Sequence, residues 1–97
     1  MESEVKLIVL IEVKPGKAQE QITLYEKIKP LVLNEEGCLC YELNRVDGSD
    51  INFILIERWK SAKSLALHDE MPYMKEVASL SPSFRARPAT IFKLNSL

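Results

Sequence analysis

The chain has 97 residues, enough for one domain, and 13 Lys and Arg oppose 14 Asp and Glu for a formal net charge of −1. With no excess of positive charge to neutralise phosphates, the composition excludes a basic nucleic-acid-binding module, and we expect no nucleic-acid partner. Only three glycines and five prolines are present, which excludes a low-complexity or collagen-like chain. We therefore predict a single domain over residues 1–97.

The first apolar segment, Val5–Val13, is interrupted by Lys6 and Glu12. It is much shorter than the roughly 20 apolar residues that a membrane-spanning helix needs. It also lacks the basic start and small-residue cleavage site of a signal peptide. We therefore expect a cytoplasmic protein with no membrane partner.

Strands are predicted at Val5–Val13, Cys38–Val46, Ile51–Trp59 and Phe84–Leu94, the first because it is rich in β-branched residues and is bounded by Lys14-Pro15-Gly16. Helices are predicted from apolar spacing at Lys17–Leu33, around Ser64–His68 after a Ser61 N-cap, and from Met71-Pro72-Tyr73 to Leu80. Gly37 is expected to end the first helix in a left-handed conformation. The Asp47-Gly48 pair predicts a hairpin turn, and Pro88 confines the last strand to a sheet edge.

The order strand, helix, strand, strand, helix, strand predicts an α+β, ferredoxin-like βαββαβ fold, with a four-stranded antiparallel sheet and helices on one face. The register of the second and third strands stays open, since a one-residue slip decides whether Tyr41 or Cys40 lies beside Glu57.

The central strands are apolar on both faces, although two helices can cover only one face. In the first strand one face carries Val5, Leu7, Val9, Ile11 and Val13, and the other carries Ile8 and Leu10. An exposed apolar sheet face is unusual in a monomer, so we predict a homodimer through this face, related by a two-fold axis. The alternative is a monomer whose central strands are merely apolar.

Cys38 and Cys40 are separated by one residue, so on a regular strand both side chains point to the same side, with Cα atoms about 6.5–7 Å apart. This spacing is at the upper limit for a disulfide, and we predict two reduced cysteines. One histidine beside a Cys-x-Cys pair does not supply the clustered ligands of a zinc site. We therefore expect no metal and no cofactor.

Glu57 and Trp59 share a strand face, and His68 follows on the helix that crosses back over the sheet. We predict that Glu57 hydrogen-bonds His68 and that the two are catalytic, with His68 the general base. The substrate pocket is predicted to be lined by Trp59, Tyr73, Tyr41, Phe53 and Met71. The alternative is structural: Trp59 is core, Glu57 pairs with Lys or Arg, and His68 caps a helix. Arg85 and Arg87 are interpreted as a solvated edge rather than an anion site.

Four segments of the chain resemble the antibiotic biosynthesis monooxygenase family over about residues 5–94. They are Val13-Lys14-Pro15-Gly16-Lys17, Glu36-Gly37-Cys38-Leu39-Cys40-Tyr41-Glu42-Leu43, Glu57-Arg58-Trp59-Lys60-Ser61, and the pair Ala66 and His68. The resemblance implies a small dimeric α/β-barrel type of ferredoxin-like domain, whose sheets pack face to face and whose pocket lies between sheet and helices.

The resemblance implies a cofactor-independent monooxygenase that acts on a small electron-rich molecule, phenolic or quinol-like. In that chemistry the substrate anion itself supplies the electrons to oxygen. The alternatives are a non-catalytic small-molecule-binding dimer, an autoinducer-processing, isomerase-like member of the family, and a purely structural dimer. Haem degradation is disfavoured, because the first strand has no Asn, and His68 and Ala78 stand where haem-degrading members have Trp and His.

Overall fold

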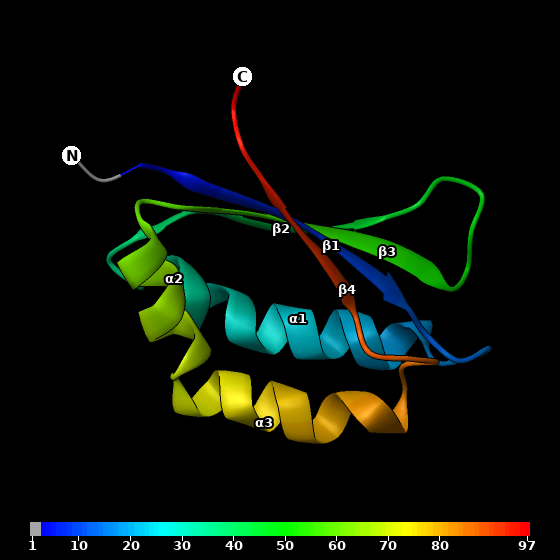
Figure 1. Cartoon of the computed structure of the whole chain (residues 1–97). Helices are drawn as coiled ribbons and strands as arrows, with labels where there is room; N and C mark the ends of the chain where they lie inside the picture. The colour runs from blue at the N-terminus through cyan, green and yellow to red at the C-terminus, as the bar shows by residue number, and fades with distance from the viewer. Residues whose placement is uncertain (1–2) are drawn as a thin grey trace.

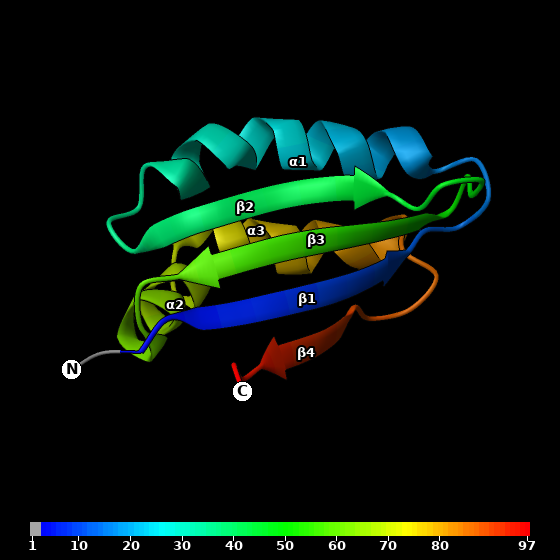
Figure 2. The same ribbon diagram turned by 90° about the horizontal axis from the view of Figure 1, so that it is seen from above.

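The structure is a computed structural model that describes residues 3–97, so the first two residues of the predicted domain 1–97 lie outside the described residues. Its elements are β1 (Val5–Glu12), α1 (Ala18–Leu33), β2 (Cys38–Arg45), β3 (Asn52–Trp59), α2 (Ala62–Asp69), α3 (Pro72–Leu80), the 3-10 turn η1 (Ser81–Ser83) and β4 (Thr90–Leu94). The strands form one antiparallel sheet in the order β2-β3-β1-β4, and the helices cover one of its faces (Figures 1 and 2). The predicted ferredoxin-like fold is confirmed. Within residues 3–97, no helix has the length and apolar character needed to cross a bilayer.

The core lies between the sheet and the helices because alternate residues of the central strands point to the helix side. The strands supply Leu7, Val9, Ile11, Phe53, Leu55 and Trp59, and α1 supplies Leu24, Ile28 and Val32. The residues between these positions point to the other side of the sheet, which no helix covers (Figure 1). This second side is called the open face below.

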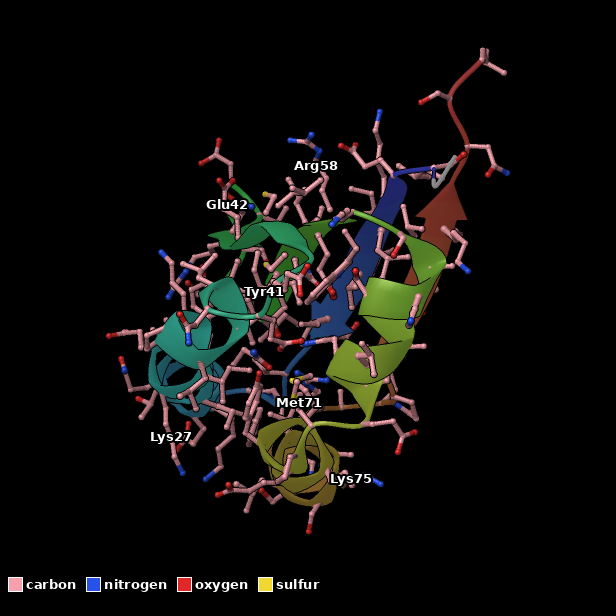
Figure 3. The ribbon with its side chains drawn as sticks, turned by 90° about the vertical axis from the view of Figure 1, so that its left-hand side faces the viewer. Lys27, Tyr41, Glu42, Arg58, Met71 and Lys75 are labelled. Atoms are coloured by element: carbon pink, nitrogen blue, oxygen red, sulfur yellow. The ribbon has the colours of Figure 1, made fainter. Side chains whose placement is uncertain are left out.

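The register of β2 against β3 places Tyr41 opposite Glu57, which resolves the alternative that the sequence left open. Tyr41 is buried on the helix side of the sheet. Figure 3 shows Tyr41 between the sheet and the helices, whereas Glu42 and Arg58 point away on the other side. The site residues of β2 and β3 therefore share the helix face.

A β-bulge at the start of β2 separates the two cysteines. Cys38 pairs with Trp59, whereas Cys40 pairs with Arg58, so Leu39 is an extra residue between them. Paired residues on neighbouring strands point to the same face. Cys38 therefore lies on the helix side with Trp59, and Cys40 lies on the open face with Arg58. The prediction that both cysteines point the same way is wrong for this reason, whereas the prediction that both are free is confirmed.

The Ser61 cap is confirmed, since its Oγ accepts a hydrogen bond from the backbone N–H of Ser64 at 3.1 Å. The left-handed conformation predicted for Gly37 is wrong, because only Gly16 and Gly48 have a positive φ in the described chain. Gly37 is needed for space instead. A Cβ on this residue would lie 2.0 Å from Ser64 Oγ, so the chain entering β2 can pass α2 only without a side chain.

The last strand is shorter than predicted, because β4 begins only at Thr90, after Pro88. It lies at the sheet edge, as predicted. The preceding residues form a connection that is tied to the end of β1: Lys14 N–H donates to Phe84 O at 2.8 Å, and Ala86 N–H donates to Glu12 O at 2.9 Å. This connection runs from α3 to β4, and it positions Arg85 beside the helices.

Candidate functional site

His68 is the centre of a buried polar network that joins α2, α3 and the loop between α1 and β2. Its side chain is 2% exposed, and its Nδ1 lies 2.8 Å from Glu35 Oε2. The Tyr73 hydroxyl donates a hydrogen bond to the same oxygen. Because a carboxylate oxygen accepts both bonds, Nδ1 carries the imidazole proton and Nε2 of a neutral ring keeps its lone pair. Glu35, from the loop between α1 and β2, therefore fixes the tautomer of His68.

The predicted hydrogen bond between Glu57 and His68 is wrong. Glu57 Oε1 instead accepts a 2.9 Å hydrogen bond from the Trp59 indole Nε1. The two side chains point to the same face of β3 from positions two residues apart, so the indole N–H reaches the carboxylate, while Nδ1 of His68 faces the α1–β2 loop. Burial raises the pKa of Glu57 above its usual value, against the Trp59 hydrogen bond and the nearby His68, which lower it.

Aromatic rings surround His68. Its ring centroid lies 4.4 Å from that of Trp59 and 5.8 Å from that of Tyr41. The Tyr25 ring stacks on Tyr41 at 5.9 Å, and burial raises the pKa of Tyr41. The structure thus brings together five of the predicted site residues, namely His68, Trp59, Tyr41, Tyr73 and, through its hydrogen bond to Trp59, Glu57. The predicted pocket residue Phe53 lies apart from this cluster, as a core residue near the start of β3. Met71, the N-cap of α3, borders the cluster: its backbone N–H donates to His68 O at 3.1 Å, and it lines a separate hollow together with Glu35.

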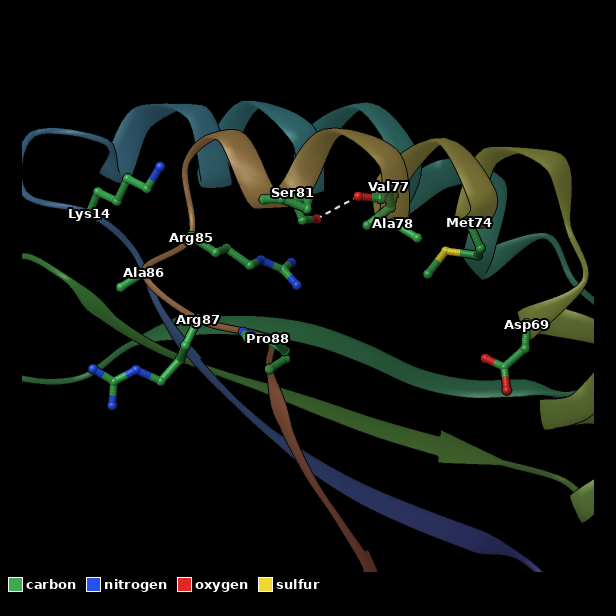
Figure 4. A pocket seen from close by; sticks show the side chains of 12 residues that line it. Lys14, Asp69, Met74, Val77, Ala78, Ser81, Arg85, Ala86, Arg87 and Pro88 are labelled. Atoms are coloured by element: carbon green, nitrogen blue, oxygen red, sulfur yellow. Dashed lines mark hydrogen bonds between the residues drawn. The ribbon is translucent and has the colours of Figure 1, made fainter.

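A large cavity lies beside this cluster, between α3 and the connection to β4 (Figure 4). It has a volume of about 770 Å³, within the range of small-molecule sites. Its apolar wall is formed by Met74, Val77, Ala78, Pro82, Ala86, Pro88 and Ala89, and its polar groups are Lys14, Asp69, Ser81, Arg85 and Arg87. The residues predicted to be catalytic or to line the pocket are absent from this wall, and only their neighbours Asp69 and Met74 belong to it.

Arg85 is the polar residue that enters this cavity from the connection to β4 (Figure 4). Its Nε donates a 3.0 Å hydrogen bond to Oε1 of Gln21, which is buried in α1. Desolvation lowers the pKa of its guanidinium. The interpretation of both arginines as a solvated edge holds only for Arg87, which is exposed and pairs with Glu12 at 3.1 Å.

Sequence reasoning missed both Glu35 and Arg85. Glu35 lies 33 residues from His68, and the local pattern around it indicates only a helix end. Arg85 had a weak signal, since an arginine between a helix and a proline-containing strand can be turned inward by the connecting turn. That turn is held by Ser81, whose Oγ donates to Val77 O at 2.5 Å and whose carbonyl accepts from Arg85 N–H at 2.9 Å.

Comparison with known proteins shows the relationships of the chain. Residues 5–79 match the sequence profile of the family described as antibiotic biosynthesis monooxygenase. The chain is 33% identical to the protein sll1783 of Synechocystis over 81 residues, which are 84% of this chain and 55% of that protein. The chain therefore spans about half the length of this relative.

A second relative is the Escherichia coli protein named "Probable quinol monooxygenase YgiN", 33% identical over 79 residues, which cover 71% of this chain and 76% of that protein. Among solved structures, PA3566 from Pseudomonas aeruginosa has the same fold, with a TM-score of 0.91, 23% identity and coverage of 100% of this chain and 97% of that one. The profile match covers most of the chain and agrees with the sequence segments noted above. The chain belongs to the antibiotic biosynthesis monooxygenase family.

Proposed function

We propose that the protein is a cofactor-independent monooxygenase that oxidises a small phenolic or quinol-like molecule in the cavity between α3 and the connection to β4. The observation that carries the proposal is this cavity of about 770 Å³, which combines an apolar wall with a few polar groups in a member of a monooxygenase family. The relative named as a quinol monooxygenase supports the substrate class.

The proposed reaction balances without a cofactor. A quinol and one O₂ give a hydroxyquinone and one water: one oxygen atom enters the ring and the other leaves as water. The quinol carbon framework supplies all four electrons that reduce O₂, so no external reductant is consumed. What the protein must provide is a shaped apolar site and a group that takes the hydroxyl proton and so raises the electron density of the ring.

His68 is the proton acceptor in this proposal, with Glu35 in the supporting role that the sequence assigned to Glu57. A carboxylate on Nδ1 holds the imidazole proton on that nitrogen and leaves Nε2 as the acceptor. Because His68 is behind the cavity wall rather than on it, a proton must reach it through water or a side-chain movement. Asp69, the next residue of α2, lies on the wall and is the competing acceptor.

A substitution that fills the cavity tests the proposal. Ala78→Trp places an indole on the α3 wall of the cavity, whereas Ser79→Trp places the same indole on the adjacent exposed residue outside it. With a panel of quinols under ¹⁸O₂, we expect one labelled oxygen atom in the product from the wild type and from Ser79→Trp, and loss of turnover in Ala78→Trp. Equal turnover in the two variants would place the reaction elsewhere.

The homodimer through the open face is also part of the proposal. This face carries exposed apolar residues on the neighbouring strands β1 and β4, including Leu10 at 40% and Phe92 at 50% exposure. Half-buried Ile8 on β1 and Ile54 and Ile56 on β3 extend the same face. A second copy that packs on this face would remove these side chains from water, which is the usual reason for such a surface.

A further inference from the structure

The cavity between α3 and the connection to β4 contains a cation, Arg85, that has no carboxylate partner. Lysine and arginine side chains that are partly buried are normally paired, because an isolated charge loses hydration energy. Within residues 3–97, Arg85 makes no ion pair. Its Nε donates to the neutral amide of Gln21, and its guanidinium carbon lies 6.0 Å from the centroid of the Phe84 ring. The two terminal nitrogens of the guanidinium have no hydrogen-bond partner among the described residues.

The guanidinium is held in place before any ligand arrives. On the backbone side, the neighbouring residues Phe84 and Ala86 are hydrogen-bonded to the end of β1. On the side-chain side, Gln21 is 4% exposed and fixes the direction of Nε. A side chain that is fixed in this way loses little conformational freedom when it binds an anion.

The other charged groups of the cavity leave Arg85 available. Arg87 is neutralised by Glu12 at 3.1 Å and points out of the cavity in Figure 4. Lys14 is exposed at the rim, where its Nζ donates to Ser83 O at 3.4 Å. Asp69, the one carboxylate on the wall, lies at the opposite end of the cavity from Arg85 (Figure 4).

We propose that Arg85 is the residue that selects the ligand of this cavity, and that the ligand is a flat, largely apolar monoanion with two oxygens on its charged group. The planar guanidinium fork matches two adjacent oxygens, as in a carboxylate or in an ionised phenol with an ortho oxygen. The apolar part of the wall, which includes Val77 and Pro88, fits a ring rather than a sugar or a second charge. A dianionic phosphate is disfavoured, because one unpaired guanidinium faces a wall that also carries Asp69.

This inference rests on the proposed function, since it assigns the substrate class of the same cavity. Four naphthalene probes test it on the wild-type protein by calorimetry. We expect 2-naphthoate and singly ionised 2,3-dihydroxynaphthalene to bind, and the neutral methyl ester of 2-naphthoate to bind roughly 10- to 150-fold more weakly, the usual range for a hydrogen-bonded charge. Equal affinity for acid and ester, or tighter binding of 2-naphthyl phosphate, would overturn the inference. If only one of the two anions binds, the outcome identifies which two-oxygen group the site accepts.

Substitutions of Arg85 provide a second, independent test of the proposal. Arg85→Gln keeps a hydrogen-bond donor and removes the charge, Arg85→Lys keeps the charge and removes the fork, and Arg45→Gln makes the same charge change at an exposed residue outside the cavity. We expect the affinity for 2-naphthoate to fall by the same 10- to 150-fold in Arg85→Gln, to fall partly in Arg85→Lys, and to stay unchanged in Arg45→Gln. Unchanged affinity in Arg85→Gln would reject Arg85 as the anchor.

Oxygen uptake separates this inference from the proposed reaction. If naphthoate binds through Arg85 but no quinol is oxygenated, the anion site stands and the monooxygenase proposal fails. If quinols are oxygenated as fast by Arg85→Gln as by the wild type, the reaction stands and the role of Arg85 fails.

Discussion

The carboxylate of Glu57 and the indole of Trp59 form a buried hydrogen bond of 2.9 Å between neighbours on one face of β3. An indole N–H needs an acceptor when it is buried, and a carboxylate needs a donor, so each side chain satisfies the other. The acceptor remains in place if Glu57 is protonated on its other oxygen. The bond therefore anchors Trp59 beneath His68 without requiring that Glu57 carry a charge.

A pH dependence of stability follows from Glu57. Burial raises its pKa in the folded state, so the folded protein binds a proton that the unfolded chain releases as the pH rises through the interval between the two values. In that interval the stability contributed by Glu57 falls with rising pH. The amide oxygen of Glu57→Gln still accepts from Trp59. We expect the free energy of unfolding of this variant, relative to that of the wild type, to increase from about pH 4 to about pH 7.

Denaturant unfolding at both pH values measures this difference. Glu26→Gln, at an exposed position of α1, is the matched control and should show no such change. A Glu57→Gln variant that loses stability at pH 7 would show that the carboxylate is needed in its charged form.

The bounds of β1 and β3 could be predicted to within about one residue, because each is a run of apolar and β-branched residues next to a turn signal, Pro15-Gly16 or Asp47-Gly48. The bulge at Leu39 could not be predicted, because the sequence Cys-Leu-Cys carries no local signal for a bulge. It depends on a distant contact: Lys60 N–H donates to Gly37 O at 2.8 Å and fixes where β2 starts.

The candidate site was predictable only in part. His68, Trp59 and Tyr41 come together because strand parity and helix crossing follow from the fold. The partner of His68 did not follow, because Glu35 reaches it from a loop whose path depends on the packing of α2. The cavity was missed because it depends on the connection between α3 and β4, where sequence patterns predicted a continuous strand.

The role of His68 in turnover can be separated from that of Asp69. We expect His68→Gln to reduce kcat by about 10²–10⁴-fold while the dimer persists, because this is the usual contribution of a positioned base. Asp69→Asn should retain turnover. The reverse result, with Asp69→Asn inactive and His68→Gln active, would show that Asp69, on the cavity wall, is the proton acceptor. Both are measured as oxygen consumption with the same quinol.

Gly37 and Ser64 form a pair that a double substitution can test. Gly37→Ala should lower the free energy of unfolding by about 1–3 kcal/mol, because the new Cβ would lie 2.0 Å from Ser64 Oγ and 2.1 Å from Ser64 Cβ. In Gly37→Ala/Ser64→Gly both of these atoms are gone and the nearest remaining atom is 3.5 Å away. The double variant should therefore be no less stable than Ser64→Gly alone, and strictly additive losses would count against the steric explanation.

Two adjacent residues of β4 test the assembly. Phe92 pairs with Ile8 on the open face, whereas Ile91 pairs with Val9 on the helix side, and both are well exposed in the single chain. Phe92→Glu should convert a particle of about twice 11.1 kDa into one of 11.1 kDa, and Ile91→Glu should leave the dimer intact. Light scattering after size exclusion gives the masses. A wild-type protein that runs as a single chain at micromolar concentration would reject the dimer itself.

The bulge at Leu39 also gives the chain two thiols in different surroundings. Burial raises the pKa of Cys38 to about 11, so at neutral pH it holds little of the thiolate that alkylating reagents need. Cys40 lies on the opposite side of β2, with its Sγ 3.8 Å from Ile56 O. A fluorescent maleimide would therefore attach first at Cys40, within the surface where two copies are proposed to meet. The labelling rate as a function of protein concentration would then report subunit exchange optically, in a protein that carries no substitution.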